Sequence, residues 1–331
     1  MKNLIRLGLL AAATVVAFGL ALKLGSVEIS WSQVWQTLSD PHSRASDAGQ
    51  IVWALRLPRA LLALLVGAAL ALSGTTFQAL LRNPLADPYI VGTSAGAALG
   101  ATLSVALTVA GWPVDRTMFA FLGAVATMIG VYRLAWVDGR LPVETFLLAG
   151  VVVGSIVWAL ATFLLLVARE QLQQALFWLM GDLSNASLAG IAVVLPHLLI
   201  GTVVLLLLAH PLNLITLGEE TAFQLGVPVE GFKLLMVTVA SLLTAAAVSV
   251  SGLIGFVGLV VPHASRRLVG ADHRVLLPGA ALAGGTFLLL ADTASRVLLP
   301  GVELPVGVVT ALLGGPFFLF VLVRRRRAGN R

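Results

Sequence analysis

The sequence predicts an all-α membrane protein with about ten transmembrane helices. Of its 331 residues, 59% are hydrophobic and only 11% are charged, and its mean hydropathy is +0.99. Soluble domains carry about 25% charged residues, so this chain has too few polar side chains to cover a water-exposed surface of its size. Long apolar runs, separated by short polar turns, recur along its whole length. Such runs are typical of helices that cross a lipid bilayer.

A helix needs about 20 apolar residues to cross the hydrocarbon. On that basis we expect spans at 4–24, 57–81, 91–111, 117–137, 145–167, 189–209, 233–251, 255–270, 275–299 and 304–323. The first run is longer than the ~7–15 apolar residues of a signal peptide, and no small-residue cleavage site follows it, so we interpret it as a helix. No long soluble segment interrupts the runs, which predicts one transmembrane domain over residues 1–331.

Basic residues predict the orientation. About two thirds of the 21 Lys and Arg residues fall on one side of the predicted spans, including the run 324–327. The positive-inside rule makes that side cytoplasmic, and an even number of spans places both termini there. The net charge of +6 is explained by these turns, so we expect no nucleic-acid partner. The bilayer itself is the expected environment.

Several chemistries are excluded by missing motifs. The chain has no cysteine, no phosphate-binding loop for ATP, no zinc-protease helix and no legible Ser/His/Asp set, and its five histidines are scattered. We therefore expect no catalytic residue, no metal site and no cofactor. The predicted spans also have few central ionisable residues, which ion-coupled carriers use as relays. These exclusions leave two classes of function: a transporter powered by another protein, or a passive channel.

Small residues and one charged pair mark two of the spans. Gly92, Gly96 and Gly100 recur at a four-residue interval, which is typical of close helix packing; a lining of the transport pathway is the alternative. Asp292 and Arg296 lie one helical turn apart near the outer end of the ninth span, where they can form an ion pair.

The segment 211–231 is the longest polar stretch on the cytoplasmic side. Thr216 and Glu219 have the spacing of a capping box, which predicts a short helix to Leu225 that Gly226 ends and after which Pro228 begins another. The segment is either an interfacial loop or a docking surface for a cytoplasmic partner. Its candidate contact residues are Thr216, Leu217, Gly218, Glu219, Glu220, Thr221, Phe223, Gln224, Leu225 and Gly226.

Three arginines fall on the outer side, against the general bias. Arg56, Arg59 and Arg296 either extend toward lipid headgroups or form a positive patch that pairs with carboxylates of an external protein or ligand.

Long motifs resemble the FecCD family of ABC-importer membrane subunits for cobalamin, heme and ferric siderophores. They are RLPR at 56–59, GxxxQ at 74–78, RNPLADP at 82–88, GxSxGA at 92–97, FWLMG at 177–181, GLIGFVGLVVPH at 252–263, DHR at 272–274 and ELPVG at 303–307. The one departure is Tyr89-Ile90, where the family pattern favours Gly-Leu and where the change could affect how the chain enters the helix beside the gate.

The resemblance implies a type II ABC importer permease fold, a homodimer, two separate cytoplasmic ATPase subunits that bind ATP and Mg²⁺, and a periplasmic substrate-binding protein. By motif position, Arg56, Arg59 and Arg296 would dock the binding protein, and Asn83, Pro84 and Leu85 would form the cytoplasmic gate. The segment 211–231 would couple to the ATPase. A short helix at about 171–180 would line the route, and 140–145 would border a second inner gate.

The implied function is permease of a bacterial inner-membrane importer that moves heme or another iron chelate, such as a ferric siderophore, into the cytoplasm. Cobalamin is the alternative cargo. An ion-coupled carrier or passive channel is a remote alternative, and a membrane enzyme is disfavoured by the lack of a catalytic constellation.

Overall fold

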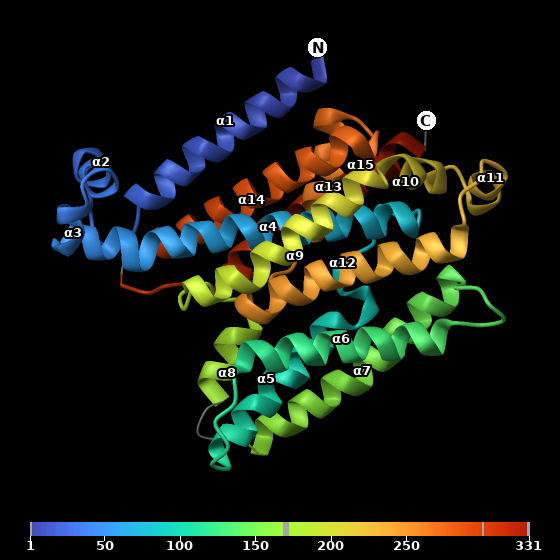
Figure 1. Cartoon of the computed structure of the whole chain (residues 1–331), viewed down its shortest axis with the longest axis horizontal. Helices are drawn as coiled ribbons and strands as arrows, with labels where there is room; N and C mark the ends of the chain where they lie inside the picture. The colour runs from blue at the N-terminus through green and yellow to red at the C-terminus, as the bar shows by residue number, and fades with distance from the viewer. Residues whose placement is uncertain (1, 168–171, 300, 330–331) are drawn as a thin grey trace.

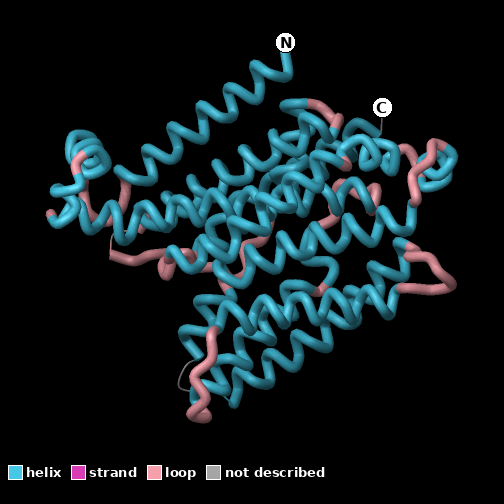
Figure 2. The backbone as a smooth tube through the Cα atoms, in the orientation of Figure 1, coloured by secondary structure: helices cyan, strands magenta, loops and turns pink. Residues whose placement is uncertain are grey.

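Helices make up almost the entire chain. The computed structural model describes residues 2–167, 172–299 and 301–329, and these residues contain no β-strand (Figure 2). Each of the ten predicted spans coincides with one helix. These helices are α1 (Lys2–Lys23), α4 (Leu57–Leu80), α5 (Thr93–Val109), α6 (Arg116–Ala135), α7 (Val143–Val167), α9 (Leu188–Leu207), α12 (Val229–Ser251), α13 (Val257–Val269), α14 (His273–Val297) and α15 (Val306–Gly329).

Membrane-spanning length differs among these helices. In the described part of the chain, seven are long and apolar enough to cross a membrane; α5 and the stretch Val306–Phe320 of α15 are shorter apolar helices. The eighth, α13, has only 13 residues, as its short apolar run predicted. The all-helical, multi-pass fold expected from composition is therefore confirmed.

Short helices lie at the two ends of the bundle. At one end are α2 (Trp31–Ser39), η1 (Pro41–Ala45), α3 (Asp47–Gln50) and η2 (Ile51–Arg56); at the opposite end are α10 (Ala209–Thr216) and α11 (Glu219–Gln224) (Figure 1). Between α4 and α5 lies η3 (Pro88–Val91), and α8 (Leu172–Leu179) follows α7. The predicted short helix at 171–180 is thus present as α8, while position 171 falls outside the described residues.

The helix that contains α4 begins earlier than the sequence indicated. Helical structure runs without a break from Asp47 to Leu80, and the turn before α4 is the wider π form. A proline lacks an N–H and its ring clashes with the carbonyl four residues before it. The π turn, which pairs residues five apart, lets the chain continue helically through Pro58.

The core of the bundle is α4. It is buried along nearly its whole length and is surrounded by α9, α12, α13 and α14. Close approach depends on glycine: a methyl group on Gly67 would overlap the Gly284 carbonyl of α14, and one on Gly74 would overlap the Gly258 carbonyl of α13. With little hydrophobic drive between helices in lipid, small residues let backbones touch and gain van der Waals contact.

A second group of helices, α5, α6 and α7, packs together and joins the core through α12 (Figure 1). A methyl group on Gly96 would overlap the Gly123 carbonyl, and one on Gly100 would overlap the Phe119 carbonyl, both on α6. The packing interpretation of this glycine repeat is therefore confirmed for these two positions. Gly92 differs, because it precedes α5 with a left-handed φ of 77°, which glycine adopts without strain.

Candidate functional site

The three arginines predicted to dock an external partner lie together near η2 and the end of α14. Arg56, Arg59 and Arg296 expose only 4%, 8% and 7% of their surface. They line one hollow of about 200 Å³, to which Glu303 also contributes. Their positive groups are therefore gathered inside the fold around a small opening, and do not extend toward lipid headgroups.

A fully buried carboxylate ties two of these arginines together. Arg59 Nε donates to Asp292 Oδ1 at 2.9 Å, and Arg59 Nη1 donates to Glu303 Oε2 at 2.8 Å. Arg296 Nε lies 3.3 Å from Asp292 Oδ2, which confirms the predicted 292–296 ion pair. Asp292 is fully buried, whereas 47% of the Glu303 side chain is exposed. Glu303 is therefore the acidic member of the cluster that faces the surface.

Two of the arginines also bind the end of α1. Arg56 donates to the carbonyls of Leu22, Lys23 and Val27, and Arg296 donates to the carbonyls of Ala21 and Leu24. The last carbonyls of a helix lack partners within the helix and carry partial negative charge. The cluster therefore joins α1, α4, α14 and the segment that leads into α15.

The predicted gate residues Asn83, Pro84 and Leu85 form the turn between α4 and η3. Asn83 Oδ1 accepts a hydrogen bond from the Leu85 N–H at 2.9 Å, and Leu85 is 52% exposed. Gln78, in the last turn of α4, donates to the Leu259 carbonyl at 3.1 Å and accepts from Arg266 at 3.1 Å, both on α13. The end of α4 that leads into the turn is thereby held against α13.

Tyr89, the departure from the family pattern, has a clear structural role. Its hydroxyl donates to the Ile254 carbonyl at 3.0 Å and accepts from the Ile254 N–H at 3.1 Å. Asp87 Oδ1 accepts from the Tyr89 N–H at 2.8 Å. Burial raises the pKa of Asp87 to about 6, and burial together with the nearby Asp87 charge raises the pKa of Tyr89. The tyrosine thus ties η3 to the segment between α12 and α13.

Two helices, α10 and α11, precede Gly226, where one short helix was expected. Thr216 ends α10, its hydroxyl donating to the Asn213 carbonyl at 2.6 Å, and Gly218 precedes α11 without a side-chain cap. The capping-box prediction for Thr216 and Glu219 is therefore wrong. The reason is that the chain turns at Gly218 with φ of 125°, a backbone conformation that only glycine adopts readily.

The rest of that prediction is confirmed. Gly226 has a left-handed φ of 88° after α11, and Pro228 directly precedes α12. Leu217, Phe223 and Leu225 are 66%, 66% and 58% exposed. Three large apolar side chains therefore project from α10 and α11 at the end of the molecule opposite the arginine hollow.

Lys233 links this segment to the rest of the molecule, and sequence reasoning missed it. Its ammonium is 2.9 Å from Glu219 Oε2 and 2.8 Å from Glu230 Oε1, and it donates to the Leu141 carbonyl at 2.9 Å. Glu230 accepts from the Leu141 N–H. Lys233 therefore connects α11 and α12 to the turn before α7, within the predicted second gate at 140–145. The sequence did contain a signal for this contact. Lys233 lies at the start of an apolar run, and two glutamates that can pair with it precede it by three and fourteen residues.

Asn213 makes a second connection from α10. Its amide donates to Asp272 Oδ1 at 2.8 Å and accepts from the His273 N–H at 2.9 Å. The hydrogen bond from the Asn213 amide to Asp272, together with the one from the Arg274 N–H, lowers the pKa of Asp272. The start of α14 is thereby fixed to α10, so displacement of α10 and α11 would act on both α12 and α14.

Comparisons with known proteins identify the family of this chain. The model of the FecCD transport family matches residues 13–324. The chain belongs to the FecCD transport family. It is 42% identical over 329 residues to the hemin transport system permease HmuU of Yersinia pestis, covering 96% of this chain and 95% of that protein. It is 46% identical over 272 residues to the cobalamin import system permease BtuC of Halobacterium salinarum, covering 82% and 73%.

The fold has a counterpart of known structure. A solved structure described as an inward-facing conformation of a metal-chelate type ABC transporter superposes with a TM-score of 0.86 at 33% identity, covering 96% of this chain and 98% of the other. The multi-pass helical fold of this chain is thus that of an ABC-importer permease.

Proposed function

We propose that this FecCD chain is the permease of an ATP-driven importer that moves heme or another iron chelate across the cytoplasmic membrane. The observation that carries the proposal is the pair of distinct surfaces at opposite ends of one membrane bundle. An arginine-lined hollow with a single exposed carboxylate lies at one end, and an apolar surface on α10 and α11 lies at the other. The arginine-lined hollow is complementary to the carboxylates of an acidic protein. The apolar surface is complementary to an ATPase subunit that binds there and displaces the helices.

In this mechanism the chain works as a homodimer with two ATPase subunits, which bind ATP and Mg²⁺, and has no hydrolytic site of its own. The α10–α11 end, both termini and the turn at Asn83, Pro84 and Leu85 face the cytoplasm. ATPase closure displaces α11. Lys233 then transmits the movement to α12 and to the turn before α7, while Asn213 transmits it to α14. The gates exchange which side is open, and the cargo passes along the dimer axis.

Nucleotide dependence tests this proposal. The permease, reconstituted in vesicles with its ATPase subunit and binding protein, should take up cargo only with ATP. The matched control omits the ATPase and keeps everything else. Equal uptake without nucleotide, or uptake driven by a proton or sodium gradient, would show an ion-coupled carrier or channel and overturn the proposal.

Cargo identity is the finer part of the proposal. The hemin permease HmuU aligns over nearly the full length of both chains, which supports an iron chelate; the greater identity to BtuC over a shorter stretch favours cobalamin as the second candidate. Competition among heme, a ferric siderophore and cobalamin in the uptake assay decides between them. Preferred inhibition by cobalamin would reject the iron-chelate assignment.

Docking of the binding protein involves Glu303 as well as the arginines. Arg59 is buried and already paired, so a carboxylate of the partner reaches it by displacing the exposed Glu303 from Arg59 Nη1. Glu303→Gln removes that competitor and should tighten docking severalfold at low salt, because charge-assisted pairs are strongest where screening is least. Glu28→Gln, an exposed acid on the same end, is the matched control. Weaker docking in Glu303→Gln would reject the exchange.

A further inference from the structure

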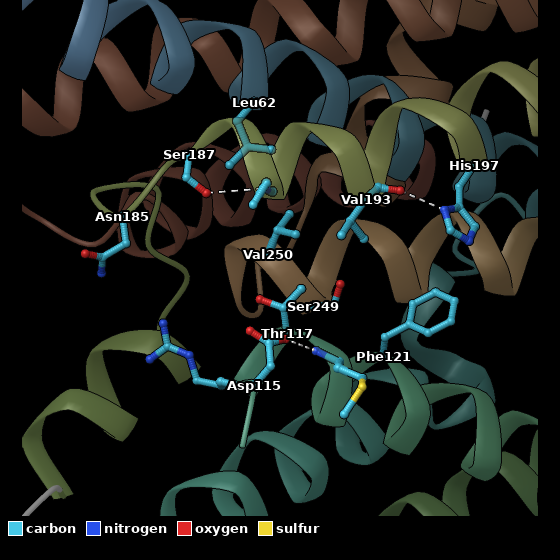
Figure 3. Close-up of a pocket in the computed structure, with 14 residues that line it drawn as sticks. Leu62, Asp115, Thr117, Phe121, Asn185, Ser187, Val193, His197, Ser249 and Val250 are labelled. Atoms are coloured by element: carbon cyan, nitrogen blue, oxygen red, sulfur yellow. Dashed lines mark hydrogen bonds between the residues drawn. The ribbon is translucent and has the colours of Figure 1, made fainter. Parts of the chain in front are cut away.

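A cleft of about 400 Å³ lies between α6 and α9 (Figure 3). Both helices pack against α12, and Val250 of α12 and Leu62 of α4 also line the cleft. The cleft lies at the end that carries α2 and α3, because it includes the first residues of α6 and α9 and the early part of α4, which follows α3. Met118, on its wall, is 50% exposed, so the cleft opens to the surface of the bundle.

Polarity changes along the length of this cleft. Asn185 and Ser187 lie toward one end of the cleft with Asp115 below them, while Phe121 and His197 lie toward the other end (Figure 3). The wall on α9 runs from Ser187 to His197, ten residues, or about 15 Å at the helical rise of ~1.5 Å per residue. One leaflet of a bilayer has about the same hydrocarbon depth, half of ~30 Å. The cleft therefore has the length and polarity of a single lipid leaflet.

His197 is already satisfied. Its Nδ1 lies 2.7 Å from the Val193 carbonyl, and its ring stacks obliquely on Phe121 with centroids 5.2 Å apart. The imidazole is thus held in place at the end of the cleft away from Ser187.

A second, more polar cavity of about 510 Å³ adjoins the first and shares Arg116, Asn185 and Val250 with it. Gln173, Asp182 and Ser184 line this second cavity. An apolar compartment and a polar compartment therefore meet at Arg116. This is the arrangement that an amphipathic molecule requires: a chain in one compartment and a headgroup in the other.

Charge at the junction indicates the kind of headgroup. Within the part of the chain that the structure describes, the Arg116 side chain forms no ion pair or hydrogen bond. The carboxylates of Asp182 and Asp115 act on it electrostatically. A guanidinium flanked by two carboxylates suits a phosphate beside an ammonium group. A headgroup with only negative charge would meet repulsion from both acids.

We propose that the α6–α9 cleft binds one zwitterionic phospholipid from the leaflet on the α2–α3 side. An acyl chain fills the apolar compartment as far as His197. The phosphate contacts Arg116, and the ammonium group lies near Asp115 and Asp182. The bound lipid fills the space between α6 and α9 and so holds the α5–α6–α7 group against the core.

The chain offers a precise way to close this cleft. Gly190 lies on its wall, and a Cβ built there has no neighbour closer than 3.7 Å, so Gly190→Phe fills the space with little backbone clash. Gly130→Phe is the matched control, because Gly130 also lies in a helix, outside the cleft, with nothing within 4 Å of a built Cβ. Arg116→Gln removes the headgroup contact without adding bulk.

Native mass spectrometry of the full-length permease in detergent measures lipid occupancy directly. The probes are phosphatidylethanolamine, phosphatidylglycerol, diacylglycerol and inorganic phosphate. We expect one tightly held phosphatidylethanolamine per chain, bound about tenfold more strongly than phosphatidylglycerol or diacylglycerol. Gly190→Phe should lower its occupancy at least tenfold, Arg116→Gln should reduce its affinity to that of diacylglycerol, and Gly130→Phe should match the native protein.

Several results would overturn the proposal. Unchanged occupancy in folded Gly190→Phe would place the lipid elsewhere, and equal binding of all lipids in every variant would indicate a nonspecific annulus. Displacement of the lipid by inorganic phosphate alone would indicate a free anion site, and displacement by heme or another chelate would make the cleft a cargo site. If Gly190→Phe does not fold, Arg116→Gln decides, since loss of headgroup discrimination in that variant requires a bound headgroup.

Discussion

Replacing Asp292 by leucine should destabilise the permease by about 3 kcal/mol. The carboxylate is fully buried and serves both Arg59 and Arg296, at 2.9 and 3.3 Å. Removing one partner of a buried ion pair costs about 3–5 kcal/mol, because a charge is left without compensation. The low end of that range applies here, since Arg59 keeps Glu303 at 2.8 Å and Arg296 keeps two carbonyls of α1.

A double-mutant cycle separates this electrostatic effect from lost packing. In Asp292→Leu/Arg296→Leu the orphaned charge on α14 is removed together with its partner, so the combined loss should be smaller than the sum of the single losses by about 2 kcal/mol. Guanidinium unfolding of the permease in detergent, followed by tryptophan fluorescence, gives the free energies. Asp47→Leu is the control, because Asp47 is exposed and such surface changes stay within about 0.5 kcal/mol.

Additivity within about 0.5 kcal/mol would refute the reasoning. It would mean that Asp292 and Arg296 contribute independently, and that the cluster is a set of separate contacts and not one shared network. A stable single Asp292→Leu variant would refute it as well, because two buried guanidinium groups would then share no essential carboxylate.

Three further predictions concern the gate, the coupling segment and the core. Lys233→Met should leave ATP hydrolysis in the reconstituted importer but lower cargo uptake per ATP at least threefold, because α11 loses its link to α12; unchanged stoichiometry would contradict this. Because burial raises the pKa of Asp87 to about 6, the folded protein keeps a proton on Asp87 at pH values where the unfolded chain has lost it. This contribution to the free energy of unfolding is fully present below about pH 4 and is lost as pH rises through about 6, a fall of up to about 3 kcal/mol. Asp87→Asn should therefore remove that fall in unfolding free energy between pH 4.5 and 7.5, and a persistent slope would assign it to another group. Gly74→Ala should cost about 2 kcal/mol, as overpacking does, because its methyl group meets the Gly258 carbonyl. Gly130→Ala, whose methyl group would have nothing within 4 Å, should cause no loss in the same unfolding assay and should gain the higher helix propensity of alanine.

Composition and hydrophobic run length were enough to predict the architecture. A charged fraction of 11% leaves lipid as the only solvent that suits the surface, and a helix in lipid satisfies its own backbone. Each apolar run therefore becomes a helix whatever its neighbours are. Run length also predicted a short α13, since the apolar run at 255–270 is the shortest of the ten expected spans. Local rules also worked where one residue decides the backbone, as at Gly226 and Pro228.

Local rules failed where a distant contact decides. The Thr216–Glu219 spacing suggested a capping box, yet Glu219 pairs with Lys233 of α12, and the chain turns at Gly218 to permit it. The position of Arg56, Arg59 and Arg296 on the outer side left headgroup contact and a docking patch open, and only the packing of α1, α4 and α14 shows that they are buried around Asp292.

The sequence by itself thus determined that helices form and where most of them lie, because hydrogen bonds within each helix are local. Only the tertiary structure decided which charges are paired, which apolar side chains stay uncovered on α10 and α11, and where α6 and α9 leave a cleft. Those features depend on side chains brought together from distant segments, as Arg59 and Glu303 are at 244 residues apart, and no local pattern encodes such contacts.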